Sequence, residues 1–507
     1  MSNSPSPITK APIAKAPFSK FFQIIQRVVT AVVGLVLILL LIWAGPLITN
    51  NGPQKFADID EHFRYASIGG EDSDGIPYWI WKVMPEVFAD YLPGEGLTSL
   101  GFIQEPDHEL PIGFAKSTNG LGLDVVTQNC ATCHAGSLRQ TPNSEAQIIS
   151  AMPSNTVDLQ RYIQFLADIS VDSRFNAANL MPYIEADAKD SGANLNPLEK
   201  AIYRFVAIPQ TRDALIKIRQ GFTFMANQTP YGPGRVDTFT SYKSRRFNFP
   251  VDHLPERELA GIADFPSIWE QGPRKGMKLH WDGNNDSIDE RNKSAALALV
   301  QPTTINFASI HRVRDWLLDL PAPKYPGSID PSLAANGKKL FANSCASCHA
   351  WDGPYVGEVT PIQEIGTDPG RLDSYTYELA SNQYTLFSDI SYKGEDQRFT
   401  HFRKTNGYAN MPLDGIWLRS PYLHNGSVPT LRDLLNDPDQ RPQTFYTGND
   451  VFDFDSVGFV SDKEVEGDRT FFHYDTTEPG NGNEGHLYGT DFSDSEKDAL
   501  VEYLKTL

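Results

Sequence analysis

Negative charge is missing from the start of the chain. Residues 1–27 contain no acidic residue and four basic ones, and residues 28–48 contain no charged residue at all. At about 1.5 Å per helical residue, the second segment suits a bilayer core about 30 Å thick, with Trp43 near its far edge. Because positive charge stays inside, we expect a basic cytoplasmic tail over residues 1–27, a transmembrane helix over residues 28–48, and export of the rest. A cleavable signal peptide is the alternative, and it would export the same part.

Basic residues are too few to balance the acidic ones. The chain has 44 Lys and Arg against 63 Asp and Glu, and the part after the tail keeps 40 basic residues, which gives it a formal net charge of −23. Nucleic-acid binding depends on clustered positive charge, so this balance excludes a nucleic acid as partner. An acidic surface can steer a basic electron carrier toward the protein, although such charge more often serves only solubility.

Cysteine is scarce, and none is left over outside two pentapeptides. These are Cys130-Ala131-Thr132-Cys133-His134 and Cys345-Ala346-Ser347-Cys348-His349. Two disulfides would be the ordinary interpretation in an exported protein, but a histidine directly after each pair is the attachment signature of c-type haem. Each thiol would form a thioether with a haem vinyl group, and the adjacent histidine would be the proximal iron ligand. We therefore predict two covalently bound haem c groups.

The length of 507 residues exceeds what one hydrophobic core usually holds, so we expect two globular units. Residues 337–341 predict a short helix that runs into Cys345, and residues 493–507 predict a closing helix with a serine cap. The proline-rich residues 320–326 are the natural linker. The expected fold is mainly α, with an elaborated N-terminal haem c domain over residues 50–320 and a C-terminal cytochrome c domain over residues 325–507, joined by long loops and preceded by the transmembrane helix.

The first haem has far more chain around it than a minimal cytochrome needs. Extra structure around a haem can form a substrate pocket, whereas an electron carrier can remain small. This favours an oxidoreductase. The alternative is a membrane-tethered electron-transfer cytochrome without a substrate of its own.

Several motifs resemble the dihaem cytochrome c peroxidase superfamily, and in particular its rubber oxygenase-like branch. They are residues 75–81, 233–237, 279–284, 410–417 and, most specific of all, 420–431. The resemblance implies an asymmetric pair of haems: the N-terminal one reacts with peroxide or dioxygen, and the C-terminal one is six-coordinate and relays electrons. The membrane anchor departs from the secreted oxygenases of that branch. Together with the basic tail, the span predicts a single-pass protein of the bacterial inner membrane with its haem domains on the periplasmic side, where a small electron-donor protein could reach them.

The second haem needs a sixth ligand from a histidine, methionine or tyrosine. Candidates after His349 are His401, Met411, His424, Tyr446, His473 and His486. His486 is similar to the distal histidine of the rubber oxygenase-like branch, and we favour it. Met411 is the alternative, because it precedes a proline much as the methionine ligand does in small cytochromes c. We expect His424 to lie near the haem, in a supporting or a purely structural role.

The first haem has no evident sixth ligand after His134. Met152, His253, His280 and His311 are available, but a lone histidine is more often a core residue than a ligand. Since peroxide or dioxygen needs an open position on iron, we expect a five-coordinate or water-bound iron there.

Two further residues are candidates for catalysis. The Trp281 indole could carry electrons between the haems, or only pack the core. Arg235 could pair with a haem propionate or polarise a bound peroxide, or form a surface ion pair.

Calcium is a further candidate ligand, because Asp282, Asn284 and Asp286 imitate the start of a calcium loop. Against it, Ser287 replaces the usual glycine and Lys293 the terminal glutamate. Peroxidases of the superfamily that the chain resembles do hold calcium between their domains.

Overall fold

The computed structural model describes Ile25, residues 27–30, Gly34 and residues 56–507. Residues 56–119 and 123–507 belong to one compact unit, which the following paragraphs describe. Most of the predicted membrane span lies outside the described residues, and among those described no helix is both long and apolar enough to cross a bilayer. The membrane anchor therefore stays a prediction.

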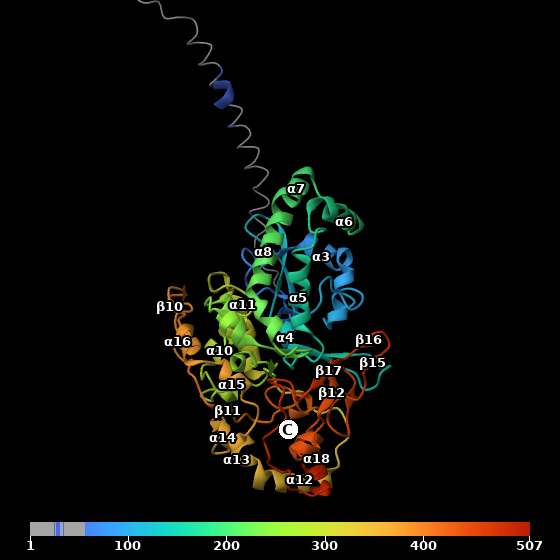
Figure 1. The fold of residues 1–507 in the computed structure, drawn as a ribbon, viewed down its shortest axis with the longest axis vertical. Coiled ribbons are helices and arrows are strands. Elements are labelled where there is room, and N and C mark those ends of the chain that lie inside the picture. Colours follow the sequence, from blue (N-terminus) through green and yellow to red (C-terminus); the bar gives the residue numbers. More distant parts are fainter. Residues whose placement is uncertain (1–24, 26, 31–33, 35–55) are drawn as a thin grey trace, which may run out of the picture. The chain divides into compact units, whose positions relative to one another are not determined.

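Helices form most of the regular structure (Figure 1). Many begin at an Asp, Asn, Ser or Thr whose side chain accepts a first-turn N–H, as Asp158, Asn176 and Asp330 do. The bounds of the helices are α2 Ile59–Tyr65, α3 Tyr78–Val87, α4 Ala131–His134, α5 Leu159–Ile169, α6 Ala177–Asp190, α7 Pro197–Ile202, α8 Ile208–Gly221, α9 Thr238–Arg245, α10 Ile288–Ala296, α11 Phe307–Asp319, α12 Pro331–Ser344, α13 Ala346–His349, α14 Ile362–Ile365, α15 Gly370–Ser374, α16 Tyr377–Gln383, α17 Leu431–Leu434 and α18 Asp494–Leu504.

Short antiparallel strands join the helices, so the fold is mixed and the mainly α expectation is only partly right. β1 to β3 form a three-stranded sheet in the order β1-β3-β2, and the other strands pair two by two. The bounds are β1 Ile76–Pro77, β2 Phe114–Thr118, β3 Asp124–Gln128, β4 Ala135–Leu138, β5 Gln147–Ser150, β6 Arg235–Val236, β7 Ala263–Asp264, β8 Val359–Pro361, β9 Ser391–Tyr392, β10 Glu395–Asp396, β11 Gly407–Ala409, β12 Thr444–Thr447, β13 Phe452–Asp453, β14 Gly458–Phe459, β15 Val465–Glu466, β16 Arg469–Thr470 and β17 Phe472–Asp475.

The two expected haem-binding regions share hydrophobic side chains. One core cluster belongs to the first region alone and gathers α3, α5, α6 and α8. A second cluster joins Phe63 and Trp269 of the first region to Trp417 and Leu500 of the second. The two regions therefore bury apolar surface against each other, and the boundary predicted at residues 320–326 stays a prediction.

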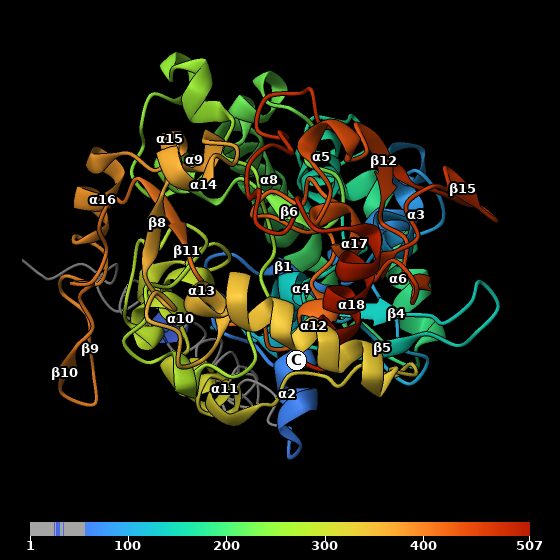
Figure 2. The ribbon, with the colours of Figure 1, turned by 90° about the horizontal axis from the view of Figure 1, so that it is seen from below.

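The closing helix of the second region is confirmed. α18 follows Ser493, which forms a capping box with Glu496, and it packs against α12 (Figure 2). Gly337 allows this close crossing, because a Cβ there would overlap the carbonyl oxygen of Ala499. Phe341 then packs on Tyr503 with ring centroids 5.2 Å apart. The helix that leads into Cys345 is thus fixed against the end of the chain.

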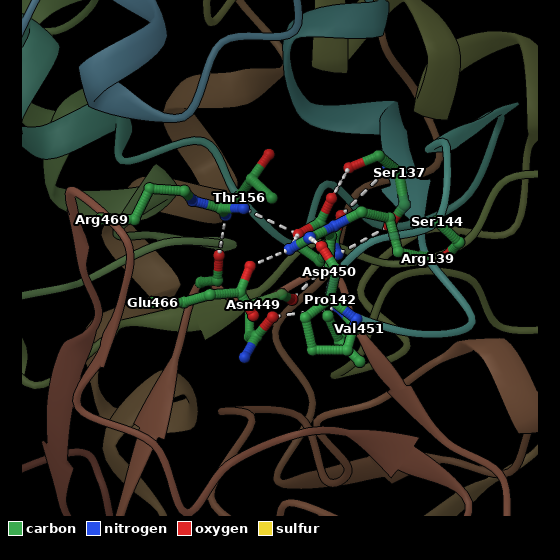
Figure 3. A network of polar contacts seen from close by, with 12 residues as sticks. Ser137, Arg139, Pro142, Ser144, Thr156, Asn449, Asp450, Val451, Glu466 and Arg469 are labelled. Atoms are coloured by element: carbon green, nitrogen blue, oxygen red, sulfur yellow. Dashed lines mark hydrogen bonds and ion pairs between the residues drawn. The ribbon is translucent and has the colours of Figure 1, made fainter.

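A buried ionic network ties the segment after the first pentapeptide to the C-terminal strands (Figure 3). Asp450 accepts hydrogen bonds from Ser137 at 3.1 Å, Arg139 at 2.7 Å and Arg469 at 2.8 Å. Burial alone would raise the pKa of Asp450, but the bonds from Arg139 and Arg469 lower it overall. The stabilisation is therefore present at neutral pH and is lost as the pH falls from the ordinary value of a carboxyl through this lowered pKa.

We predict that Asp450→Asn lowers the free energy of unfolding by about 1–2 kcal/mol, because Arg139 and Arg469 lose a charged acceptor, although Arg139 keeps its ion pair with Glu466. The midpoint of urea unfolding measures this loss. Asp462→Asn is the matched control: the Asp462 side chain is 77% exposed and lies 3.7 Å from Lys463, whereas that of Asp450 is 7% exposed. Equal midpoints for the two variants would contradict a stabilising role for the network.

Candidate haem sites

The first pentapeptide forms a single helical turn, α4, directly after β3. The buried Asn129 starts this turn: its Oδ1 accepts from Ala131 N at 3.0 Å, and its Nδ2 donates to the carbonyls of Arg64 and Ala66. His134 N then donates to Cys130 O at 3.1 Å. Cys130, Cys133 and His134 consequently face one cavity.

That cavity has a volume of about 980 Å³, at the upper end of the roughly 300–1,000 Å³ typical of small-molecule and cofactor sites. Its walls are largely apolar and include residues of α5, α8, α9, α10 and α11, among them Arg245 and Arg314. A haem is an apolar ring that carries two carboxylates. An apolar cavity with two thiols, an imidazole and basic side chains fits that group.

The chemistry of the thiols and of the imidazole agrees with this fit. Burial raises the pKa of Cys130 to about 11 and that of Cys133 to about 12, so both thiols are protonated at neutral pH. All four cysteines are free of disulfides. Burial and the nearby Arg291 lower the pKa of His134 to about 4, which keeps its ring neutral, as a metal ligand must be.

Both proximal histidines are held in the same way. His134 Nδ1 lies 2.9 Å from the carbonyl oxygen of Pro266, and His349 Nδ1 lies 2.8 Å from that of Met411. An imidazole that donates Nδ1–H to a carbonyl keeps the lone pair of Nε2 free for a metal. The histidines of the two pentapeptides are therefore oriented alike, as two metal ligands would need to be.

His486 faces His349 in the second site. Their ring centroids are 6.2 Å apart, close to the roughly 6 Å expected for two imidazoles that hold one metal ion between them with bonds of about 2 Å. The His486 ring forms no hydrogen bond to another described residue, and its Nδ1 is buried. A metal ion on Nε2 would still leave Nδ1 without a partner, so the spacing of the two rings is the observation that fits a shared metal ion. Met411, by contrast, uses its backbone to hold His349.

The loop around His486 is fixed by backbone contacts. His486 has a φ of +46°, rare for a residue with a side chain, and its N–H donates to Ile365 O at 2.8 Å. The buried Arg441 donates to the carbonyls of Asn483 and Gly485. Strained backbone of this kind persists only where its surroundings determine it, and it concentrates at functional sites.

Trp281 lies in the wall of the first cavity, and its backbone bonds to the strand that leads to Met411. Its Nε1 donates to Asp264 O at 2.8 Å, and its carbonyl accepts from Ala409 N at 2.8 Å. Ala409 is two residues before Met411, which holds His349. The backbone of Trp281 is thus linked to the segment that holds His349.

Arg235 and His424 do not line the first cavity. Arg235 is buried, donates to Tyr231 O, Pro230 O and Asn481 Oδ1, and lies over the ring of Tyr474, which favours a structural role. His424 is also buried, with Nε2 2.9 Å from Tyr408 Oη, and its carbonyl accepts from Asp264 N. It thus supports the strand β7 that leads to Pro266.

The structure gives no support to calcium in the loop of residues 282–286. Asp282 pairs with Arg371, Asn284 Oδ1 lies 2.6 Å from His280 Nδ1, and Asp286 pairs with Lys278 at 3.0 Å. No group of three or more His, Cys, Asp and Glu side chains able to hold a metal ion occurs within the described ranges.

Two cavity residues were not predicted to have a role. His280 was only one of several available histidines, and Arg291 carried no signal at all, since its place in the cavity depends on how α10 packs. Both line the same cavity as His134. The closeness of Arg291 to each histidine contributes to the lowered pKa of both.

Comparison with known proteins agrees with this geometry. The cytochrome c family matches residues 334–412, which include the second pentapeptide. The chain contains a cytochrome c domain. A family described as RoxA-like, cytochrome c-like matches residues 407–446 and spans the most specific of the resembling motifs. Cytochrome c domains carry covalently bound haem c and serve electron transfer or redox catalysis.

Two proteins of Sinorhizobium fredii are similar to this chain. The uncharacterized protein y4iJ is 27% identical over 82% of the chain and 85% of its own length. The uncharacterized protein y4iM is 33% identical over 49% of the chain and 65% of its own length.

We predict that Gly485→Ala destabilises the protein more than Gly394→Ala. Both glycines have a left-handed φ, at +75° and +84°, but a Cβ at position 485 would overlap the backbone of Gly366, whereas a Cβ at position 394 meets nothing within 4 Å. Beyond the shared cost of the backbone conformation, Gly485→Ala should therefore cost about 1–3 kcal/mol more. Thermal unfolding measures the difference. Equal shifts in Tm would show that the loop is not tightly held.

Proposed function

We propose that the protein is a membrane-anchored dihaem c-type oxidoreductase, in which a first haem, bound at Cys130, Cys133 and His134, reacts with peroxide or dioxygen. A second haem, bound at Cys345, Cys348 and His349, relays electrons. The anchor would be a single span of the bacterial inner membrane, with both haems on the periplasmic side. The matched cytochrome c domain supports the second haem, and the matching pentapeptide and cavity support the first.

One observation carries the proposal: the two sites differ on the side opposite the proximal histidine. His486 faces His349 across 6.2 Å, whereas no ring contact joins His134 to another histidine in the part of the chain that the structure describes. The first site opens instead into the cavity of about 980 Å³. When bound, haem iron supplies the change of oxidation state and, where a ligand position is open, a binding place for peroxide or dioxygen.

The chain's own residues would divide the remaining work. Pro266 O and Met411 O orient the two proximal rings, and His486 closes the second site to small ligands. The apolar cavity walls exclude water from the first site. The Trp281 indole would pass electrons between the sites, and this role is supported by its place in the wall of the first cavity and by its backbone bond to the strand that leads to Met411. A small basic protein would suit the acidic surface as electron donor.

We predict two covalently attached haem groups per chain. Acid–acetone extraction should leave all haem on the protein, and a pyridine haemochrome assay should count two. Cys130→Ala with Cys133→Ala should reduce the count to one. A count of one in the wild type, or haem in the solvent, would contradict the assignment of the first site.

We predict that His486→Ala converts the second haem from low-spin to high-spin without releasing it, because Cys345, Cys348 and His349 remain. Electron paramagnetic resonance of the oxidised protein measures the change. Met411→Ala is the control and should leave the low-spin signal in place; the opposite pattern would make Met411 the ligand. If both haems of the wild type are low-spin and bind none of peroxide, dioxygen and carbon monoxide, the enzyme hypothesis is wrong. The electron-carrier alternative then takes its place.

A further inference from the structure

His280 is held in an unusual conformation at the wall of the first cavity. Its φ is +64°, and its Nδ1 lies 2.6 Å from Asn284 Oδ1. An imidazole that donates Nδ1–H to an amide oxygen has an unprotonated Nε2. Asn284 is itself buried, and its backbone carbonyl accepts from Arg403 N at 2.8 Å, so the contact is anchored. His280 thus offers a basic nitrogen within the cavity that also contains His134.

Arg291 is a cation without a counter-charge beside it. No hydrogen bond or ion pair joins its guanidinium to any residue that the structure describes, in contrast to Arg314, which pairs with Asp289 at 2.9 Å, and to Arg371, which pairs with Asp282 at 2.9 Å. Burial, aided by Arg274, lowers the pKa of Arg291 to about 10, so it stays charged at neutral pH. A half-buried, unpaired guanidinium in an apolar cavity favours an anion beside it.

We propose that His280 and Arg291 act together on the small ligand that enters the first site: His280 Nε2 accepts its proton, and Arg291 stabilises the anion that remains. For hydrogen peroxide the O–H bond breaks, the proton goes to Nε2, and the electron pair stays on oxygen as hydroperoxide. Asn284 is a positioning residue, since it fixes which nitrogen of His280 is free. This inference rests on the proposed function and names the residues that serve it.

The surroundings of His280 keep its ring unprotonated. Burial and Arg291 lower its pKa to about 4, Arg371 acts in the same direction, and Asn284 and Asp282 act against it. The ring of Phe402 stacks on the other side, with centroids 6.2 Å apart. The imidazole is therefore neutral at pH 7 in the absence of a ligand.

Cyanide binding to the oxidised full-length protein tests the pair without turnover, because hydrogen cyanide must also lose a proton to bind as an anion. His280→Asn tolerates the left-handed φ and should lower the association rate constant roughly 100-fold. Arg291→Gln should weaken the affinity about tenfold or more. His253→Asn and Arg257→Gln, both at exposed positions, are the matched controls and should bind as the wild type does.

Each variant must first show the wild-type haem count and an unchanged low-spin signal from the second haem, which excludes misfolding as the cause. If the wild type binds cyanide and both variants match it, the pair has no such role and the proposed function stands. If Arg291→Gln instead shifts the reduction potential of the first haem at unchanged cyanide affinity, Arg291 pairs with a haem carboxylate and its proposed role is overturned. If the wild type binds no cyanide, the proposal that the first haem has an open ligand position is wrong.

Discussion

The hydrogen bond from a proximal imidazole to a backbone carbonyl is the contact on which both sites depend. It fixes the tautomer of His134 and of His349 and aims each ring at the place where a metal would lie. The two acceptors, Pro266 and Met411, come from segments far from the pentapeptides in sequence. Each site therefore exists only when distant parts of the chain have packed correctly.

The acceptor segments also connect the sites to each other. Residues 263–269 bond to Gly234, Ala151 and His424, and Trp269 Nε1 donates to Asp414 O at 3.1 Å. Residues 407–414 bond in turn to Trp281 and support His349. Two short segments with little regular structure thus orient both histidines through buried backbone hydrogen bonds.

The sequence was most informative where function depends on adjacent residues. The pentapeptides and the closing helix could be found because spacing, capping and periodicity are local, and the second pentapeptide lies in a matched cytochrome c domain. Arg235 is a residue whose surroundings could not be predicted from the sequence. Arginine chemistry suggested that it binds an anion, but in the structure it is buried and donates to Tyr231 O and Asn481 Oδ1. The calcium-like spacing stays a prediction without support, because Arg371 and Lys278, which lie elsewhere in the sequence, pair with its carboxylates. Arg291 could not be found at all, since only packing reveals an unpaired charge.

The position of His486 makes its contact with His349 sensitive to local unfolding. It lies near the chain terminus, and its loop is held by Arg441 and by the end of α14 rather than by residues next to His349. Bringing such distant groups together costs loop-closure entropy that only the folded C-terminal region repays. If His486 does bind the second iron, any local opening of that region would remove it before the thioethers break. The visible absorption spectrum of the protein would then change before global unfolding, and it would report the state of the tertiary structure around His486.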